Sequence, residues 1–498
     1  MALGVAGCPR PPEPPGPPPA EMAFVPMPSE ASQAVTIRVA FGAGSADDPA
    51  GLERIAQMAV RLVVEGGTET MSYPELVRRL FPLAAELDWQ ADRDQTVVVA
   101  RVHRDLLEEF YPVFLEVLTR PRMAAADLER LRAVSISELE ADLKASDDEE
   151  LGKEALQAFI YEGHPYGHPP VGTRAGLDAM TVETVRAHRE RTLCAGRATV
   201  GVAGGYPERF AERLESDLRA GLPRECAARA PLPPPPVFEG RRVLIVEKPG
   251  NRATAISIGF PIDMRRDHPD YPALALATVW FGQHRQFVGR LMREIREERG
   301  FNYGDYAYCE HFRQAGRTRF PEVNVSRRRQ MFSIWIRPLR PDHARFVLRL
   351  AMREHERFVA AGLPPEELDA VRTFALGYFN LYRQTESRRL GFAIDDRFHG
   401  LDRPFLDGLM DAWPSVTADQ VRSVVARALT ADDVKIAIVA PDGEALADEI
   451  ASGSPSPMTY ETPKAPEILA EDAEIEAYPL RIPRDAIRVI PAAGIFAR

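Results

Sequence analysis

Apolar side chains alternate with small or polar ones in three short stretches, at the period of two that is typical of β-strands. The stretches are "AVTIRVAFGAGS" at 34–45, "QTVVVARV" at 95–102 and "ATAISIGF" at 253–260. The first and third place their large apolar residues in the same alternation: Val35, Ile37, Val39 and Phe41 in one, and Ile256, Ile258 and Phe260 in the other. We therefore expect half-buried strands at similar places in two halves of the chain.

Helical periodicity fills the first half between its strands. The expected helices lie at about 51–64, 73–86, 103–118 and 124–161. The order of strand, helices, strand, long helices and strand has no regular βαβ alternation. It predicts an α+β fold rather than a doubly wound parallel sheet.

The ends of the two halves match each other in sequence. "MTVETVR…ATVGVAGG" and "VTADQVR…VKIAIVAP" align without a gap at an offset of 236 residues. The aligned pairs are Thr181 with Thr417, Val185 with Val421, Arg186 with Arg422, and Val200 with Ile436. An internal duplication explains this better than chance, and each copy should close with a short helix that leads into a strand.

Proline-rich segments divide the chain. A leader at 1–33 is expected to be extended or disordered, with regular structure beginning near residue 34. The segment 226–240 contains "APLPPPPVFEG", whose four consecutive prolines should form a stiff spacer. The predicted modules are 34–225 and 241–450, and the acidic tail 451–498 is expected to lie across the surface.

Size and charge exclude several classes of protein. The 498 residues are too many for one hydrophobic core, and 45% hydrophobic with 27% charged residues is ordinary globular composition. A net charge of −11, without a basic stripe, argues against nucleic-acid binding. The sequence has no run of 18 apolar residues, so no transmembrane span is predicted. The four cysteines are widely spaced, so we expect neither a disulfide framework nor a zinc ribbon.

The beginning of the chain leaves its location open. "LGVAGC" ends at Cys8 and precedes a proline-rich stretch, as at a bacterial lipoprotein processing site. Only seven residues come before the cysteine, fewer than a signal peptide needs. The sequence is thus compatible with the bacterial cell envelope or periplasm if Cys8 carries a lipid, and otherwise with the cytoplasm.

Four motifs resemble the insulinase/pitrilysin-like zinc peptidases, the inverzincins related to mitochondrial processing peptidase. They are "GS…D…GL" at 44–52, "EGGT" at 65–68, "HPYGHPPVGT" at 164–173 and "GRLMREIREERGFNY" at 289–303. The resemblance covers roughly 33–450. It implies two homologous modules, each a mainly antiparallel sheet with helices packed on it, that face each other as a clamshell.

The resemblance also locates a zinc site that this chain has lost. In the family, Gly-Leu-x-His-x-x-Glu-His carries two zinc ligands and the general base on one helix, but here the matching stretch is "GLERIAQMA". Arg54 and Met58 take the ligand positions and Gln57 takes the base position. Arginine cannot coordinate a cation and glutamine cannot take a proton from water. The third ligand plausibly corresponds to Glu138, which cannot hold zinc alone, so we expect neither a metal nor a catalytic residue in this chain.

The family's substrate-binding pair is kept. Its arginine and tyrosine, seven residues apart, match Arg296 and Tyr303 across Gly300, and their N–H and O–H groups can donate to the carbonyl oxygens of a bound peptide. Arg296 as a solvated residue of a charged helix, with Tyr303 packed, is the alternative interpretation.

A lost metal site beside a kept substrate pair favours a non-catalytic partner subunit of a two-chain zinc peptidase. The resemblance implies an HxxEH-bearing partner that supplies the zinc in a heterodimer. A homodimer of this chain is the other possible assembly. A structural scaffold subunit is the first alternative. A peptidase with substituted ligands, such as Glu138 with His103 or His164, is the weaker one.

Overall fold

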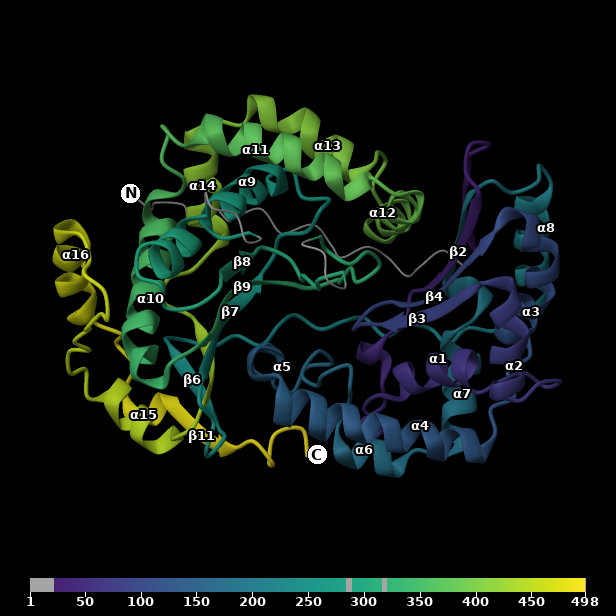
Figure 1. The fold of residues 1–498 in the computed structure, drawn as a ribbon, viewed down its shortest axis with the longest axis horizontal. Helices are drawn as coiled ribbons and strands as arrows, with labels where there is room; N and C mark the ends of the chain where they lie inside the picture. Colours follow the sequence, from purple (N-terminus) through teal and green to yellow (C-terminus); the bar gives the residue numbers. More distant parts are fainter. Residues whose placement is uncertain (1–21, 284–288, 316–319, 498) are drawn as a thin grey trace, which may run out of the picture.

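Two β-sheets, each with its own layer of helices, form the two halves of the protein. The computed structural model describes residues 22–283, 289–315 and 320–497. In this part of the chain the first sheet has the strand order β1-β5-β2-β4-β3, and the second has β11-β6-β10-β7-β9-β8. The predicted α+β class and clamshell architecture are confirmed (Figure 1).

The first half extends from β1 to α8. Its strands are β1 (Ala23–Pro28), β2 (Ala34–Phe41), β3 (Glu86–Ala91), β4 (Thr96–His103) and β5 (Ala198–Gly204). Its helices are α1 (Ile55–Glu65), α2 (Tyr73–Leu80), α3 (Leu107–Thr119), α4 (Ala125–Ser137), the π-helical η4 (Glu138–Ser146), α5 (Asp148–Ile160), α6 (Arg174–Ala179), α7 (Val182–Thr192) and α8 (Phe210–Gly221).

The second half begins after the proline-rich spacer. Its strands are β6 (Arg242–Glu247), β7 (Thr254–Ile262), β8 (Asp305–Tyr308), β9 (Gln330–Leu339), β10 (Lys435–Ala440) and β11 (Ile487–Pro491). Its helices are α9 (Tyr271–Phe281), the π-helical η6 (Met292–Glu297), α10 (Ala344–Ala361), α11 (Leu368–Asn380), α12 (Glu386–His399), α13 (Phe405–Ala412), α14 (Ala418–Ala428), α15 (Gly443–Ala451) and α16 (Pro466–Glu476).

The duplicated sequence corresponds to duplicated structure. Strand β5 runs parallel to β1 and antiparallel to β2, and β10 has the same relations to β6 and β7. The helices α7 and α14 that precede these strands both begin at a threonine capping box, at Thr181 and Thr417. The threonine hydroxyl accepts a hydrogen bond from a backbone N–H of the first turn, which explains why this residue recurs at the offset of 236.

The central strands are buried on both faces, not half-buried as predicted, because each half covers the sheet of the other. On β2 the large apolar residues face the helices of the first half, whereas Ala40 packs against Leu390 and Ile394 of α12 from the second half. Reciprocally, α5 of the first half packs against β7 and β10. At Gly152 of α5 an added Cβ would lie 3.3 Å from Ser257 Oγ, which shows how closely helix and sheet approach.

Several elements depart from the sequence prediction. A strand, β1, lies within the proline-rich leader, where it pairs with β5 at the edge of the first sheet. An edge strand tolerates Pro26 and Pro28 because one side of its backbone needs no partner. The C-terminal segment is more than a surface tail, since β11 adds a strand to the second sheet and α16 packs beside α10 (Figure 1). The predicted helix 73–86 ends at Leu80, and Glu86 begins β3.

The widely spaced cysteines predicted no disulfide framework, yet the structure contains one disulfide. Cys194 and Cys226 form a disulfide that links the end of the first half to the start of the spacer, with Cα atoms 5.7 Å apart. Their 32-residue separation carries no recognisable motif, so only the fold reveals the pair. Cys309 is buried and free, and Cys8 lies outside the described residues. No helix in the described ranges is long and apolar enough to cross a membrane.

Candidate functional site

Arg54 stands just before α1 rather than on it. The helix begins at Ile55, and Arg54 has a left-handed backbone with φ of 92°. Buried Asp48 caps the helix, because its carboxylate accepts from the backbone N–H groups of Arg54 at 2.7 Å and Ala56 at 2.9 Å. Position 54 therefore lies at the start of the helix rather than within it, although the N–H of Met58 still donates to the carbonyl of Arg54 at 2.9 Å. Met58 is fully buried in the core of the first half.

The side chain of Arg54 forms an ion pair with Glu138. Its Nη2 contacts Glu138 Oε2, and its Nη1 donates to the carbonyl of Val171 at 2.9 Å. A second guanidinium, from Arg61, reaches both oxygens of the same carboxylate at 2.9 and 3.0 Å. Burial lowers the pKa of Arg54 to about 10, against the opposing effect of Glu138, so the guanidinium remains charged at neutral pH. The structure thus brings Arg54 and Glu138 together, as the sequence alignment implies.

These residues do not fit a zinc ion. A guanidinium offers only donors, and two of them already neutralise the single carboxylate. Gln57 is the one degenerate position that faces the space between the two halves, and its buried Oε1 accepts no hydrogen bond from the described residues. A neutral amide there can bind a ligand but cannot act as a general base.

The histidines considered as substitute ligands lie elsewhere. His103 ends β4, where its Nδ1 accepts from Asp105 N at 3.3 Å. His164 follows α5, and its Nε2 lies 3.1 Å from the carbonyl of Pro233 in the spacer. Over the described residues, the only grouping of potential metal ligands is Glu294, Glu298 and Glu471, which includes neither histidine nor Glu138.

The segment 164–173 forms hydrogen bonds with two other parts of the first half, at Asp94 and at Arg54. The hydroxyl of Tyr166 donates to Asp94, and the carbonyl of Val171 binds Arg54. At Gly172, φ is +76°, and an added Cβ would lie 2.4 Å from Arg54 Cβ. The loop can approach Arg54 only with glycine at this position.

A cavity of about 450 Å³ lies between the two halves. It is lined by Gln57 and by residues of β3, α5, β8 and β9. One wall is largely acidic and another largely aromatic: Asp147, Glu149, Glu150 and Glu154 on the first, and Tyr306, Tyr308, Phe312 and Trp335 on the second. Because β3 and β8 are the edge strands of their sheets, two sheet edges flank this cavity.

Charged contacts close the two halves around the cavity. Arg327 of the second half binds buried Asp92 of the first through two hydrogen bonds of 2.7 and 3.2 Å. Arg328 reaches Asp94, which Arg229 of the spacer also binds at 2.7 Å. Burial alone would raise the pKa of Asp92, but the charge and hydrogen bonds of Arg327 and His311 hold it well below its ordinary value.

Arg296 and Tyr303 lie together on the second half. The Arg296 guanidinium carbon sits 5.4 Å from the centre of the Tyr303 ring, a cation–π distance, and Tyr303 is 77% exposed. Gly300, with φ of +75°, makes the turn that brings η6 back toward the ring. The described lining of the cavity includes neither residue, but it includes Tyr306, three positions beyond Tyr303.

A buried carboxyl lies behind this turn. Asp305 accepts from Asn302 Nδ2 at 2.7 Å through Oδ1, while its Oδ2 has no partner among the described residues. Burial raises the pKa of Asp305 to about 8, and the nearby carboxylate of Glu149 adds to the rise. Asp305 is therefore mostly protonated at neutral pH.

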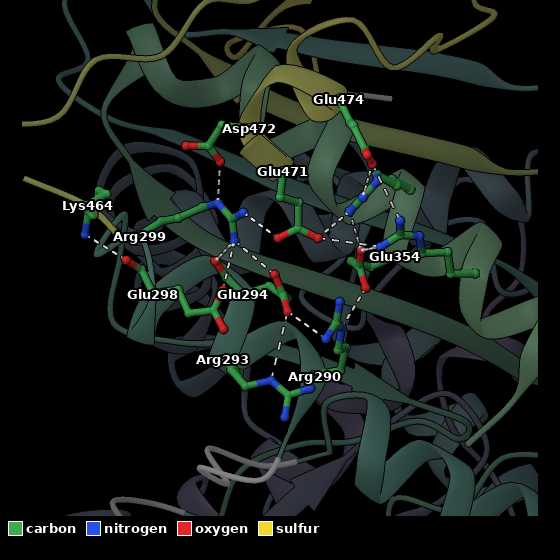
Figure 2. A network of polar contacts seen from close by, with 12 residues as sticks. Arg290, Arg293, Glu294, Glu298, Arg299, Glu354, Lys464, Glu471, Asp472 and Glu474 are labelled. Atoms are coloured by element: carbon green, nitrogen blue, oxygen red, sulfur yellow. Dashed lines mark hydrogen bonds and ion pairs between the residues drawn. The ribbon is translucent and has the colours of Figure 1, made fainter. Parts of the chain in front are cut away.

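Two charged neighbours of Arg296, Glu294 and Arg299, are buried. Arg299 is completely buried and contacts Glu294 at 2.9 Å, Glu471 at 2.8 Å and Asp472 at 2.9 Å (Figure 2). Burial raises the pKa of Glu294 to about 7. The sequence shows a dense run of charge at 293–299 and an acidic tail, but it does not show that α16 connects them.

Comparisons with known proteins agree with this architecture. The family model described as "Insulinase (Peptidase family M16)" matches residues 25–174, and "Peptidase M16 inactive domain" matches 179–374. This chain belongs to the insulinase family, peptidase family M16. Both halves of the M16 arrangement are thus accounted for in order, as the four sequence motifs predicted.

Individual M16 relatives differ in what their names say. A protein of Mycobacterium leprae called an uncharacterized zinc protease is 24% identical over 57% of this chain and 63% of its own length. The match therefore spans less than two thirds of that relative. A Helicobacter pylori protein called a non-peptidase homolog, YmxG, is 20% identical over 81% of this chain and 88% of its own.

A solved structure supports the M16 fold. The crystal structure of a peptidase M16 inactive domain from Pseudomonas fluorescens superposes with a TM-score of 0.74 at 22% identity. It covers 85% of this chain and 97% of the other. At this level of identity the likeness concerns the fold.

Proposed function

We propose that this M16 chain is a non-catalytic, peptide-binding subunit that completes the active site of an HxxEH-bearing partner chain. The observation that carries the proposal is the Arg54–Glu138–Arg61 ion pair, which takes the place of a metal-binding set in a fold that still presents Arg296 and Tyr303 together. The catalytic zinc would then belong to the partner, in a heterodimer. A homodimer would have no metal-binding chain and would act only by binding peptide.

The cavity between the halves has room for a short extended peptide segment. Its 450 Å³ lies in the range of ligand sites and is too small for a folded domain. The edge strand β3 offers backbone groups to which a peptide can add as a further strand, whereas the N–H of Ala307 in β8 already donates to Gly282. Arg296 and Tyr303 would then donate to peptide carbonyl oxygens outside the cavity.

Peptide binding is tested with a fluorescein-labelled unstructured peptide and fluorescence anisotropy. Arg296→Ala and Tyr303→Phe are expected to weaken binding by about tenfold each, since a charged or buried hydrogen bond contributes roughly 1.5 kcal/mol. Arg293→Ala is the matched control, because Arg293 lies on the same helix and its acidic neighbours are 3.9 Å away. Unchanged binding in Arg296→Ala and Tyr303→Phe would refute the proposed role of the pair.

The role as a partner subunit needs a second experiment. The chain is mixed with an HxxEH-bearing M16 chain from the same organism, and hydrolysis of a quenched fluorescent peptide is measured. Turnover that requires both chains, and that Arg296→Ala reduces while the complex still assembles, is the expected result. Turnover that is indifferent to Arg296 and Tyr303 would favour a scaffold role.

The disulfide supports a location for this function. Because disulfides persist in oxidising compartments, the Cys194–Cys226 bond favours the cell envelope over the cytoplasm. Fractionation of cells that express the tagged chain, with thiol labelling of Cys194 and Cys226, tests this. Recovery in the cytoplasm with both thiols reduced would contradict it.

A further inference from the structure

We propose that the C-terminal segment 458–476 is the positioning element for Arg296 and Tyr303. This inference rests on the proposed function, because it assigns the segment a role in the same peptide-binding site. It concerns how a pair on an exposed turn is held in one geometry although neither residue is packed into the core.

The strongest link is between Arg299 and α16. The guanidinium of Arg299 has no exposed surface, and its Nη2 and Nε donate to Glu471 at 2.8 Å and Asp472 at 2.9 Å. Its Nη1 donates to Glu294 in η6 at 2.9 Å (Figure 2). The guanidinium therefore joins the C-terminal helix to the helix that carries Arg296.

Two further contacts hold the same stretch from the tail side. Lys464 Nζ donates to the carbonyl of Glu298 at 2.7 Å. The ring of Tyr460 stacks on Phe301 with centroids 5.8 Å apart, and its hydroxyl donates to Asp472 at 2.7 Å. Contacts with the tail thus occur on both sides of Gly300.

The residues of 294–303 form two groups according to what they contact. Glu294, Glu298, Arg299 and Phe301 contact the tail, α10 or one another. Arg296 instead lies over the ring of Tyr303, which is exposed. At Gly300 an added Cβ would meet no atom within 4 Å, so the turn itself is not packed. Backbone hydrogen bonds from Gly300 to Arg296 at 2.8 Å and from Phe301 to Ile295 at 3.2 Å close the turn. The tail contacts then hold this closed turn from both sides and so fix where Arg296 and Tyr303 lie.

A metal-ion interpretation of the same cluster is less consistent with its contacts. The ligand atoms of Glu294, Glu298 and Glu471 lie within 4.8 Å of one another. However, Arg299 contacts all three carboxylates, at 2.9, 3.5 and 2.8 Å, so a cation is already present in the form of the guanidinium. Arg290 also contacts Glu294 at 2.8 Å, and Arg353 contacts Glu471 at 2.7 Å.

The test uses Glu471→Gln/Asp472→Asn in the full chain, which removes two charges without changing side-chain size. Hydrogen exchange of the backbone amides at 292–308 is expected to become about tenfold faster, because local opening no longer breaks charged contacts. Affinity for the fluorescein-labelled peptide should fall by a similar factor. Lys464→Ala is a milder second variant with a smaller effect in the same direction, should the double variant fold poorly.

Glu474→Gln is the matched control. Glu474 lies on α16 as well, but it is 67% exposed and contacts Arg353 rather than Arg299. Exchange at 292–308 and peptide affinity should stay at wild-type values in this variant.

Different results distinguish failure of this inference from failure of the proposed function. Wild-type exchange at 292–308 in Glu471→Gln/Asp472→Asn would overturn the positioning role. If Arg296→Ala weakens peptide binding, then faster exchange in Glu471→Gln/Asp472→Asn without a loss of peptide affinity would also overturn the positioning role. Wild-type affinity in Arg296→Ala would instead refute the peptide-binding function, and the exchange data alone would then decide whether the tail holds the turn.

Discussion

Removing the guanidinium of Arg54 should destabilise the first half of the protein. In Arg54→Ala, Glu138 loses one of two positive partners, and the carbonyl of Val171 loses its donor. Breaking a fully buried ion pair costs about 3–5 kcal/mol. Because Glu138 is 32% exposed and keeps Arg61, we expect a smaller loss of unfolding free energy, about 2–3 kcal/mol.

Backbone strain allows the contact to be separated from the conformation. Arg54 has φ of 92°, a region that costs a residue with a Cβ about 1 kcal/mol and costs glycine little. Arg54→Gly should therefore be about 1 kcal/mol more stable than Arg54→Ala, yet still less stable than wild type. Arg54→Lys keeps the charge but not the two-pronged geometry, so it should recover only part of the loss.

Urea unfolding followed by circular dichroism, with thermal melts, provides the measurement. The free-energy loss for Arg54→Ala corresponds to a melting temperature lower by about 5–10 °C. Arg174→Ala is the control, because Arg174 forms an exposed pair with Asp178, and it should change stability little. Wild-type stability in Arg54→Ala and Arg54→Gly would refute the view that this guanidinium replaces a metal as the link between α1, Glu138 and the 164–173 loop.

Three further predictions concern other parts of the molecule. Because the folded-state pKa of Asp305 is raised from 3.8 to about 8, its contribution to stability is present at low pH and lost as pH rises through this window. Between pH 5 and 8, wild type should therefore lose unfolding free energy relative to Asp305→Asn by up to about 1.4 kcal/mol per pH unit. A difference between the two that does not change with pH would contradict the burial of a neutral carboxyl. Cys194→Ser/Cys226→Ser should lower the unfolding free energy by about 3.7 kcal/mol, as a 32-residue loop predicts, and equal stability of oxidised and reduced wild type would count against the bond. Arg327→Ala leaves buried Asp92 without its bidentate partner and should cost about 3 kcal/mol in urea unfolding, whereas Arg313→Ala, which removes a half-exposed pair with Glu322, should cost under 1 kcal/mol.

Features that depend on local sequence were predictable. The alternation at 35–41 identifies the residues of β2 that face their own helices, and Thr181 and Thr417 mark the starts of α7 and α14. The substitution of Arg54, Gln57 and Met58 for zinc-binding residues also follows from sequence, because it depends on residue types at fixed spacing.

Features that depend on contacts between distant parts of the chain could not be predicted from the sequence. The sequence of β2 does not show that α12 of the other half covers its second face. The prolines of β1 argue against a strand, although β1 is an edge strand. Position 54 was expected on a helix, but capping by Asp48 starts α1 one residue later. Two partners of Arg299, Glu471 and Asp472, lie more than 170 residues away in α16, so the burial of Arg299 could not be predicted from the charged stretch around it.

Zinc content tests the central claim most directly. The purified chain is dialysed against a weak chelator and its metal is measured by elemental analysis, without any partner present. The account predicts close to zero zinc per chain, because Arg54 and Arg61 already neutralise Glu138. One zinc per chain that is lost in Glu138→Ala would show that the first half binds metal after all, and would contradict a non-catalytic subunit.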